Sequence, residues 1–290
     1  MQELTVFQSL WGMESLGGER DSWSLEEQLQ RIADESFDGV NFEDDNPEAA
    51  RVVQTARELG LRWSLTTFPK TVADLRTAID LVDELGHDGF DHVNLQPNVR
   101  PGTVLEGIPF VLGWIETARA AGIERLYIET HRDRMTTDLH YTLQLVDAIP
   151  SMRLTADLSH FVVGREFRWP ISDEDEALIM RVIDRADAFH GRVATREQIQ
   201  VQLGFPHQRQ WVDLFMHWWA EGLRRWRKRS DPDATLNFLV ELGPPPYAMT
   251  GPDGEELSDR WEEALQMQRM IRALWNRLDA EDQASRTATN

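Results

Sequence analysis

The chain has 290 residues, 41% of them hydrophobic, and no cysteine, which suffices for one large core and excludes disulfides and thiolate metal sites. Its net charge of −20 argues against nucleic acid as a partner, because contact with a phosphate backbone depends on clustered Lys and Arg. The sequence contains neither a run of about 18 apolar residues nor a signal-peptide pattern, so we expect a soluble, cytoplasmic protein without a membrane partner.

Short β-like runs alternate with helical patterns along the whole chain. The eight predicted strands are residues 4–11, 39–43, 61–67, 91–97, 125–130, 153–158, 185–193 and 235–242. Eight β-then-α units of this length predict a single-domain (β/α)8 TIM barrel over residues 1–278. An open doubly wound sheet is the alternative, but no G-x-G-x-x-G motif follows the first strand.

Residues typical of helix starts and helix ends lie between these runs. Cap spacings occur at Ser24 with Glu27, Thr71 with Asp74, Ser172 with Asp175, and Asn46-Pro47, and glycines that would end helices are Gly60, Gly86 and Gly122. The last helix is expected to begin near Ser258. The polar residues 279–290 after it are expected to form a disordered tail.

Four consecutive predicted strands end in side chains that can bind a metal. These side chains are Glu129, Asp157, His190 and Glu241. In this fold the carboxyl ends of the strands carry the chemistry. Each residue alone could be a loop cap or a satisfied hydrogen-bond partner, but packing all four together without a cation is costly.

A divalent metal ion removes that cost. Three carboxylates and one imidazole, with no sulfur, suit Mn²⁺ best, while Co²⁺, Mg²⁺ or Zn²⁺ are also compatible. Such an ion can polarise a carbonyl and stabilise the enediolate that forms when the neighbouring carbon loses its proton. Glu129 and Glu241, one on each side, could remove and return that proton as a catalytic pair.

The ordered set Glu129, Asp157-x-x-His160, His190 and Glu241 resembles the xylose isomerase-like barrel superfamily, which includes the sugar phosphate isomerases/epimerases and ketose 3-epimerases. The resemblance spans nearly all of residues 4–278. It implies that the four residues above bind the metal and that both glutamates act as acid and base. It also implies that His160 and Arg196 contact substrate oxygens, with Arg192 as an alternative to Arg196.

His131 is a further candidate for substrate binding, although a solvated loop histidine is an equally good interpretation.

The chain departs from relatives with three zinc ions, since its strands 2 and 3 end in NFED and TTFP, without histidine. Its only lysines are Lys70 and Lys228. This shortage argues against xylose isomerase proper and against a Schiff-base aldolase.

The expected substrate is a small sugar or keto-sugar. The stiff loop 243–247, GPPPY, offers few backbone donors to a phosphate. Arg132, Arg134 and Arg165, however, are compatible with an acidic or phosphorylated substrate. Trp11 and Phe68 could form an apolar wall for a sugar ring, or lie in the core.

Three functions remain compatible with these residues. The first is a metal-dependent sugar isomerase or epimerase, and the second is a lyase or dehydratase on a keto-sugar or keto-glycoside, which shares the first proton abstraction. The third is a non-catalytic sugar-binding barrel. A homodimer or homotetramer is compatible with the composition. The basic run 224–229 is interpreted as the end of a helix rather than a nucleic-acid patch.

Overall fold

Eight parallel strands close into a barrel in the computed structural model, which describes residues 1–16 and 22–289. The strands are β1 (Glu3–Ser9), β2 (Gly39–Glu43), β3 (Arg62–Thr67), β4 (Phe90–Leu95), β5 (Leu126–Glu129), β6 (Leu154–Ala156), β7 (Ala186–Gly191) and β8 (Thr235–Val240). Each strand pairs with the next, and β1 closes the ring on β8 with Val6 opposite Phe238. The predicted TIM barrel is confirmed.

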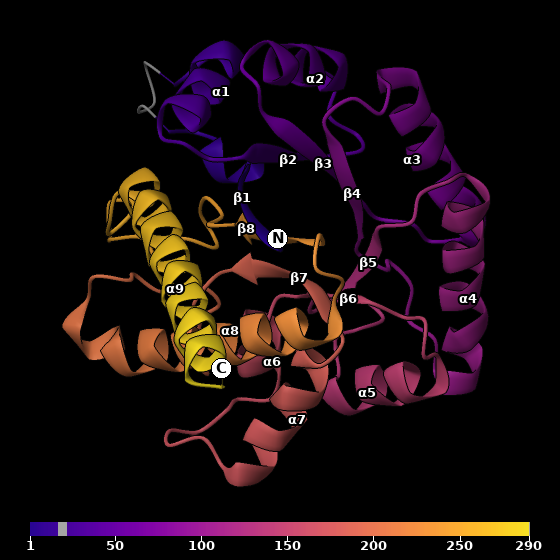
Figure 1. Cartoon of the computed structure of the whole chain (residues 1–290). Coiled ribbons are helices and arrows are strands. Elements are labelled where there is room, and N and C mark those ends of the chain that lie inside the picture. The colour runs from indigo at the N-terminus through magenta and orange to yellow at the C-terminus, as the bar shows by residue number, and fades with distance from the viewer. Residues whose placement is uncertain (17–21, 290) are drawn as a thin grey trace.

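The helices form an outer ring around the strands (Figure 1). They are α1 (Leu25–Asp34), α2 (Ala49–Glu58), α3 (Val72–Leu85), α4 (Val104–Ala120), α5 (Leu139–Ala148), α6 (Ser159–Gly164), α7 (Asp173–Ile183), α8 (Arg209–Arg229) and α9 (Arg260–Thr289), with short 3-10 turns η1 (Trp11–Met13) and η2 (Pro206–Gln208). Both α6 and α7 lie between β6 and β7. The barrel therefore carries one short extra helix directly after β6.

Most of the predicted helix boundaries are present. Ser24 and Thr71 form capping boxes, and Ser172 accepts a hydrogen bond from the amide of Asp175. The prediction of an N-cap at Asn46 was wrong, because α2 starts at Ala49. Asn46 instead accepts a hydrogen bond from the amide of Glu48 within the preceding turn.

Helix α9 packs on β1 and β8 and continues past the expected domain boundary at Leu278. Residues 279–289, expected to belong to a disordered tail, continue this helix, and Asn290 lies outside the described residues. The end of α8 provides the partner: Arg227 pairs with Asp279 at 2.9 Å and with Asp282 at 3.2 Å. These ion pairs join the first turn of the extension to α8, a contact that the polar composition alone did not predict.

Other arginines of the basic run on α8 also form ion pairs. Arg225 lies 2.8 Å from Asp184, and Arg229 lies 2.6 Å from Asp187. The two tryptophans in the same helix, Trp218 and Trp219, are buried in the core. The run is therefore the terminus of a packed helix. In the described part of the chain, no helix combines the length and hydropathy needed to span a membrane.

A series of side-chain hydrogen bonds crosses the barrel interior and ends at Glu129. The hydroxyl of Thr66 donates to the side-chain oxygen of Asn41, and the amide group of Asn94 donates to Thr66 and, at 2.5 Å, to Glu129. These four residues come from β2, β3, β4 and β5. All four residues are buried, so these hydrogen bonds restrain the side chain of Glu129 in addition to the backbone pairing of β5.

Candidate active site

The four predicted ligands meet at the carboxyl ends of their strands. One ligand atom each from Glu129, Asp157, His190 and Glu241 lies within 4.8 Å of the others. Glu129 is the last residue of β5, His190 lies in β7, and Asp157 and Glu241 directly follow β6 and β8. All four are buried. The fold therefore assembles the cluster from four consecutive strands.

Glu129 has no exposed surface and is held through both carboxylate oxygens. Asn94 donates to one oxygen at 2.5 Å, and Gln96 donates to the other at 3.2 Å. Burial, together with the charges of Glu241 and Asp157, raises the pKa of Glu129 to about 7. Burial thus keeps this carboxylate costly to ionise, although His190 lies 3.7 Å away and lowers its pKa.

Asp157 uses only half of its hydrogen-bonding capacity. Its Oδ1 accepts hydrogen bonds from the amide of Ser159 at 3.0 Å and from the Ser159 hydroxyl. Its Oδ2 is buried and, among the described residues, has no hydrogen-bond partner. A buried carboxylate oxygen without a partner is costly, so this atom points to a ligand.

His190 and Arg192 both contact Glu241. The Nδ1 of His190 lies 3.0 Å from Glu241 Oε2 and 3.7 Å from Glu129 Oε1. Arg192 donates to the backbone oxygen of Glu241 at 3.0 Å and to its side chain at 2.5 Å. Burial alone would raise the pKa of Glu241, but the charges of His190 and Arg192 lower it to about 2.

The guanidinium of Arg192 is buried beside two aromatic rings. It lies 5.6 Å from the ring of Trp11 and 4.7 Å from that of Tyr247. Its second terminal nitrogen, Nη1, has no hydrogen-bond partner within the described part of the chain. Arg192 is therefore a fixed cation with one donor available to a bound molecule.

His131 and His160 stand beside the cluster with their ring centroids 3.8 Å apart. His160 is buried, and its Nε2 lies 3.4 Å from Asp157 Oδ2. His131 lies on the loop after β5, where its Nδ1 donates to the backbone oxygen of Arg132. The structure thus places both predicted substrate-binding histidines at the mouth of the barrel.

Arg196 lies in a different environment from Arg192. It pairs with Glu166 at 3.1 Å and Glu197 at 2.7 Å, on the loops after α6 and β7. Of the two arginines proposed from the sequence, Arg192 is the one joined to Glu241.

Arg134 lies over the ring of Phe68 and donates a hydrogen bond to Gln96, which in turn donates one to Glu129.

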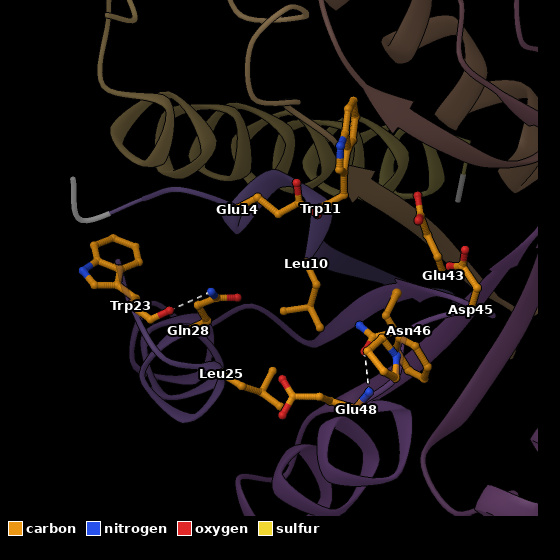
Figure 2. A pocket seen from close by; sticks show the side chains of 12 residues that line it. Leu10, Trp11, Glu14, Trp23, Leu25, Gln28, Glu43, Asp45, Asn46 and Glu48 are labelled. Carbon is orange, nitrogen blue, oxygen red and sulfur yellow. Dashed lines mark hydrogen bonds between the residues drawn. The ribbon is translucent and has the colours of Figure 1, made fainter. Parts of the chain in front are cut away.

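A cavity of about 540 Å³ opens at the carboxyl ends of β1 and β2 (Figure 2). Its lining includes two tryptophans and four acids, namely Trp11, Trp23, Glu14, Glu43, Asp45 and Glu48. Burial, together with the charges of Asp45 and Glu241, raises the pKa of Glu43 to about 7. Since Trp11 also contacts Arg192, the cavity adjoins the carboxylate cluster.

Solved structures match almost the whole chain. A D-allulose 3-epimerase from Methylomonas sp., in complex with D-allulose, covers 94% of this chain and 98% of its own at 14% identity, with a TM-score of 0.59. A xylose isomerase-like TIM barrel protein from Mycobacterium smegmatis, in complex with magnesium, covers 93% and 96% at 14% identity, with a TM-score of 0.58. The fold is that of the xylose isomerase-like barrels.

Proteins with other activities share this xylose isomerase-like fold. An AP endonuclease of family 2 from Brucella melitensis matches 84% of this chain and 94% of its own at 14% identity, with a TM-score of 0.50. No protein-family model matches the chain, and no curated protein matches it. The chemistry must therefore be argued from the site itself.

Several contacts at the mouth of the barrel were missed in the sequence. Asn94 and Gln96 hold Glu129, Ser159 holds Asp157, and Glu43 borders the cavity. Asn94 and Gln96 alternate with apolar residues in the stretch VNLQP. Polar residues on the inner face of a buried strand were the signal that could have identified them.

The donor set fits one divalent metal ion. It offers three carboxylates and one imidazole, and Asp157 Oδ2 is a buried acceptor still without a partner. Hydrogen bonds from Asn94, Gln96 and Ser159 orient the carboxylates of Glu129 and Asp157, as metal sites usually require. An oxygen-rich set with one nitrogen suits Mn²⁺ or Mg²⁺ more than a structural zinc.

Proposed function

We propose that this protein is a divalent-metal-dependent sugar isomerase or epimerase that moves a proton on the carbon next to a carbonyl. The observation that carries the proposal is the convergence of Glu129, Asp157, His190 and Glu241 on one point at the barrel mouth. The D-allulose complex of a barrel with the same fold supports a sugar as the ligand.

The four side chains would hold the metal, with Mn²⁺ as the first choice. An ion bound there would supply Lewis-acid chemistry, lowering the cost of the negative charge that develops on the substrate carbonyl oxygen. The protein contributes the preorganised ligands, because Asn94 and Ser159 already fix Glu129 and Asp157.

Glu129 and Glu241 would handle the proton. They come from β5 and from the end of β8, and both approach His190. Their environments push the two pKa values apart, to about 7 for Glu129 and about 2 for Glu241. At neutral pH Glu241 is therefore ionised and free to take the proton, whereas Glu129, whose pKa lies near neutrality, can return it from the other side.

The cavity beside the cluster would receive the rest of the substrate. Its volume of about 540 Å³ lies within the usual range for small-molecule sites. Trp11 offers a ring face for a sugar, and Arg192 and His160 offer polar groups without partners among the described residues. A substrate with several hydroxyl groups can satisfy these groups and the nearby Glu43 together.

Nucleic acid fits this mouth poorly. Glu14, Glu43, Asp45 and Glu48 line the cavity, and the chain carries a net charge of −20. A phosphate backbone would meet repulsion there. We therefore propose a small sugar or keto-sugar as the substrate, and not DNA.

The test is incorporation of deuterium from heavy water into unphosphorylated ketoses, ketose phosphates and keto-glycosides, with Mn²⁺ present. Mass spectrometry should find one deuteron on the carbon next to the carbonyl, and none with Glu241→Gln. A product with a new stereocentre or a moved carbonyl identifies an epimerase or isomerase, whereas loss of water or aglycone identifies a lyase. If none of these substrates takes up deuterium, the proposed proton transfer is contradicted and a non-catalytic sugar-binding barrel is the remaining function.

A further inference from the structure

Gln96 lies between Glu129 and an arginine of the loop after β5. It directly follows β4 and is 5% exposed. Its Nε2 donates to Oε1 of Glu129 at 3.2 Å, and its own Oε1 accepts a hydrogen bond from Nε of Arg134 at 3.2 Å. We propose that Arg134 is a positioning residue for Glu129, which acts by fixing the orientation of the Gln96 amide group.

The chemistry of the guanidinium group decides how this amide is turned. Arginine has N–H donors and no acceptor, so the Gln96 atom that faces Arg134 must be the amide oxygen. The amide nitrogen is then directed at Glu129, where it donates. A reversed amide would place its oxygen against the carboxylate and its NH2 group against the cation, which is repulsive at both ends. Arg134 thus makes Gln96 a donor to Glu129.

The two oxygens of Glu129 are held by donors that are fixed in different ways. Asn94 donates to Oε2 at 2.5 Å and also donates to Thr66, so its orientation is set within the barrel. The orientation of Gln96 depends instead on Arg134, which comes from a loop. Part of the restraint on this carboxylate is therefore supplied from outside the strands.

The loop after β5 holds Arg134 in place. The amide of Met135 donates to the backbone oxygen of Pro97 at 3.0 Å, which joins the loops after β4 and β5. The guanidinium lies 5.7 Å from the ring of Phe68 and donates to the backbone oxygen of Asp133 at 3.0 Å. Only 18% of the Arg134 side chain is exposed. An arginine restrained in this way can orient its partner, because little conformational freedom remains to be lost.

This inference rests on the proposed function, in which Glu129 binds the metal ion. Hydrogen bonds to a ligating carboxylate determine the direction in which its remaining lone pairs point. Loss of Arg134 should leave all four ligands present but relax the orientation of one of them. We therefore expect weaker binding and altered coordination of the ion, at an unchanged number of ions per chain.

The test compares Co²⁺ binding to the metal-free full chain of wild type and variants. Arg134→Met removes every donor and keeps an unbranched side chain beside Phe68. Its Co²⁺ affinity should fall about 10-fold, with a change in the visible absorption spectrum of the bound ion. Gln96→Met should give the same loss, and combining the two substitutions should add nothing, because both break one series of contacts. Arg134→Lys, which retains a donor, should bind Co²⁺ more tightly than Arg134→Met.

Arg100→Met is the matched control, since it removes the same charge from the neighbouring loop. Arg100 pairs with Asp133, an exposed residue of the loop after β5. This variant should bind Co²⁺ like wild type, and thermal unfolding should show that all variants are folded. Wild-type affinity in Arg134→Met, equal losses in Arg134→Met and Arg100→Met, or a further loss on adding Arg134→Met to Gln96→Met would each overturn the inference.

The amide protons of the Gln96 side chain separate this inference from the proposed function. They can be followed by NMR in metal-free protein labelled with ¹⁵N-glutamine and assigned by comparison with Gln96→Met. They should exchange with solvent at least about 10-fold faster in Arg134→Met than in wild type or Arg100→Met, since the hydrogen bond to a charged group is lost. Faster exchange together with no Co²⁺ binding in wild type would support the positioning role and contradict the metal-dependent function. Unchanged exchange together with Co²⁺ binding by wild type would overturn the positioning role and leave the proposed function intact.

Discussion

The Nδ1 atom of His190 lies 3.0 Å from Oε2 of Glu241, between the adjacent strand ends of β7 and β8. Burial alone would lower the pKa of His190, but the charges of Glu241 and Glu129 raise it to about 9. At neutral pH the metal-free imidazole is therefore protonated. A metal must displace that proton before the nitrogen can act as a ligand.

Metal affinity should consequently increase with pH. Protons on His190 and Glu129 compete with the ion, so the increase should extend across the range between their pKa values, about 7 and about 9. Titration calorimetry in buffers of different ionisation enthalpy should detect proton release on Mn²⁺ binding at neutral pH. An affinity that does not change over this range would contradict the expected proton displacement.

Glu241→Gln should reduce turnover by about 10³-fold or more, because it removes the base while keeping the shape of the side chain. The variant should remain folded, as judged by thermal unfolding, since the neutral amide can still contact Arg192. Steady-state kinetics on the substrate identified by deuterium exchange provide the measurement. Near-normal turnover would remove Glu241 from the proton transfer.

Asn94→Ala should impair catalysis without removing any ligand. The hydrogen bond from Asn94 lowers the pKa of Glu129, so its loss should raise that pKa. The acid limb of the kcat/KM profile should then move to higher pH, because Glu129 must lose its proton before it can hold the metal, and kcat should fall about 10-fold or more.

Asn237→Ala is the control for this experiment. Asn237 is also a buried asparagine of the barrel interior, but it donates to Thr5 rather than to Glu129. Its replacement should cost similar stability and leave the pH profile unchanged. Equal shifts of the acid limb in both variants would assign the effect of Asn94 to the fold alone.

Asp91→Asn should destabilise the barrel at the end opposite the site. Asp91 is buried in β4, 2.7 Å from His92 and 2.9 Å from Arg125, and also pairs with Arg62. Burial alone would raise its pKa, but the contact with His92 and the arginine charges lower it to about 2. Loss of this buried charge should cost about 3 kcal/mol in chemical denaturation.

The pH dependence of stability should change with it. A carboxylate with a lowered folded pKa stabilises the protein above its unfolded pKa of about 4, and this contribution is lost as the pH falls towards 2. The stability of Asp91→Asn should therefore fall less steeply than that of wild type over this range. Asp88→Asn, an exposed neighbour, should behave like wild type.

The eight strands and the four candidate ligands could be predicted because both depend on local pattern. A strand end that carries Glu129 or Asp157 stands out in a buried apolar run, and the fold places all such ends on one face. The resemblance added His160 and Arg196, with Arg192 as the alternative, and the structure places His160 and Arg192 next to Asp157.

The contacts that orient the site could not be predicted in the same way. Asn94 reaches Glu129 from the neighbouring strand, and the choice between Arg192 and Arg196 depends on how the loop after β7 turns. The helical extension of α9 beyond Leu278 likewise depends on Arg227 of another helix. These features are set by tertiary contacts between distant parts of the chain.

The most direct test of the metal-dependent mechanism is retention of one added equivalent of Mn²⁺ per chain, measured by mass spectrometry after dialysis. Wild type and the control His87→Phe, which removes only an exposed ion pair with Asp83, should retain most of the ion, whereas His190→Ala and Asp157→Ala should lose most of it. Equal retention by wild type and both ligand variants, or no retention by any of them, would contradict a metal centre at these four strand ends.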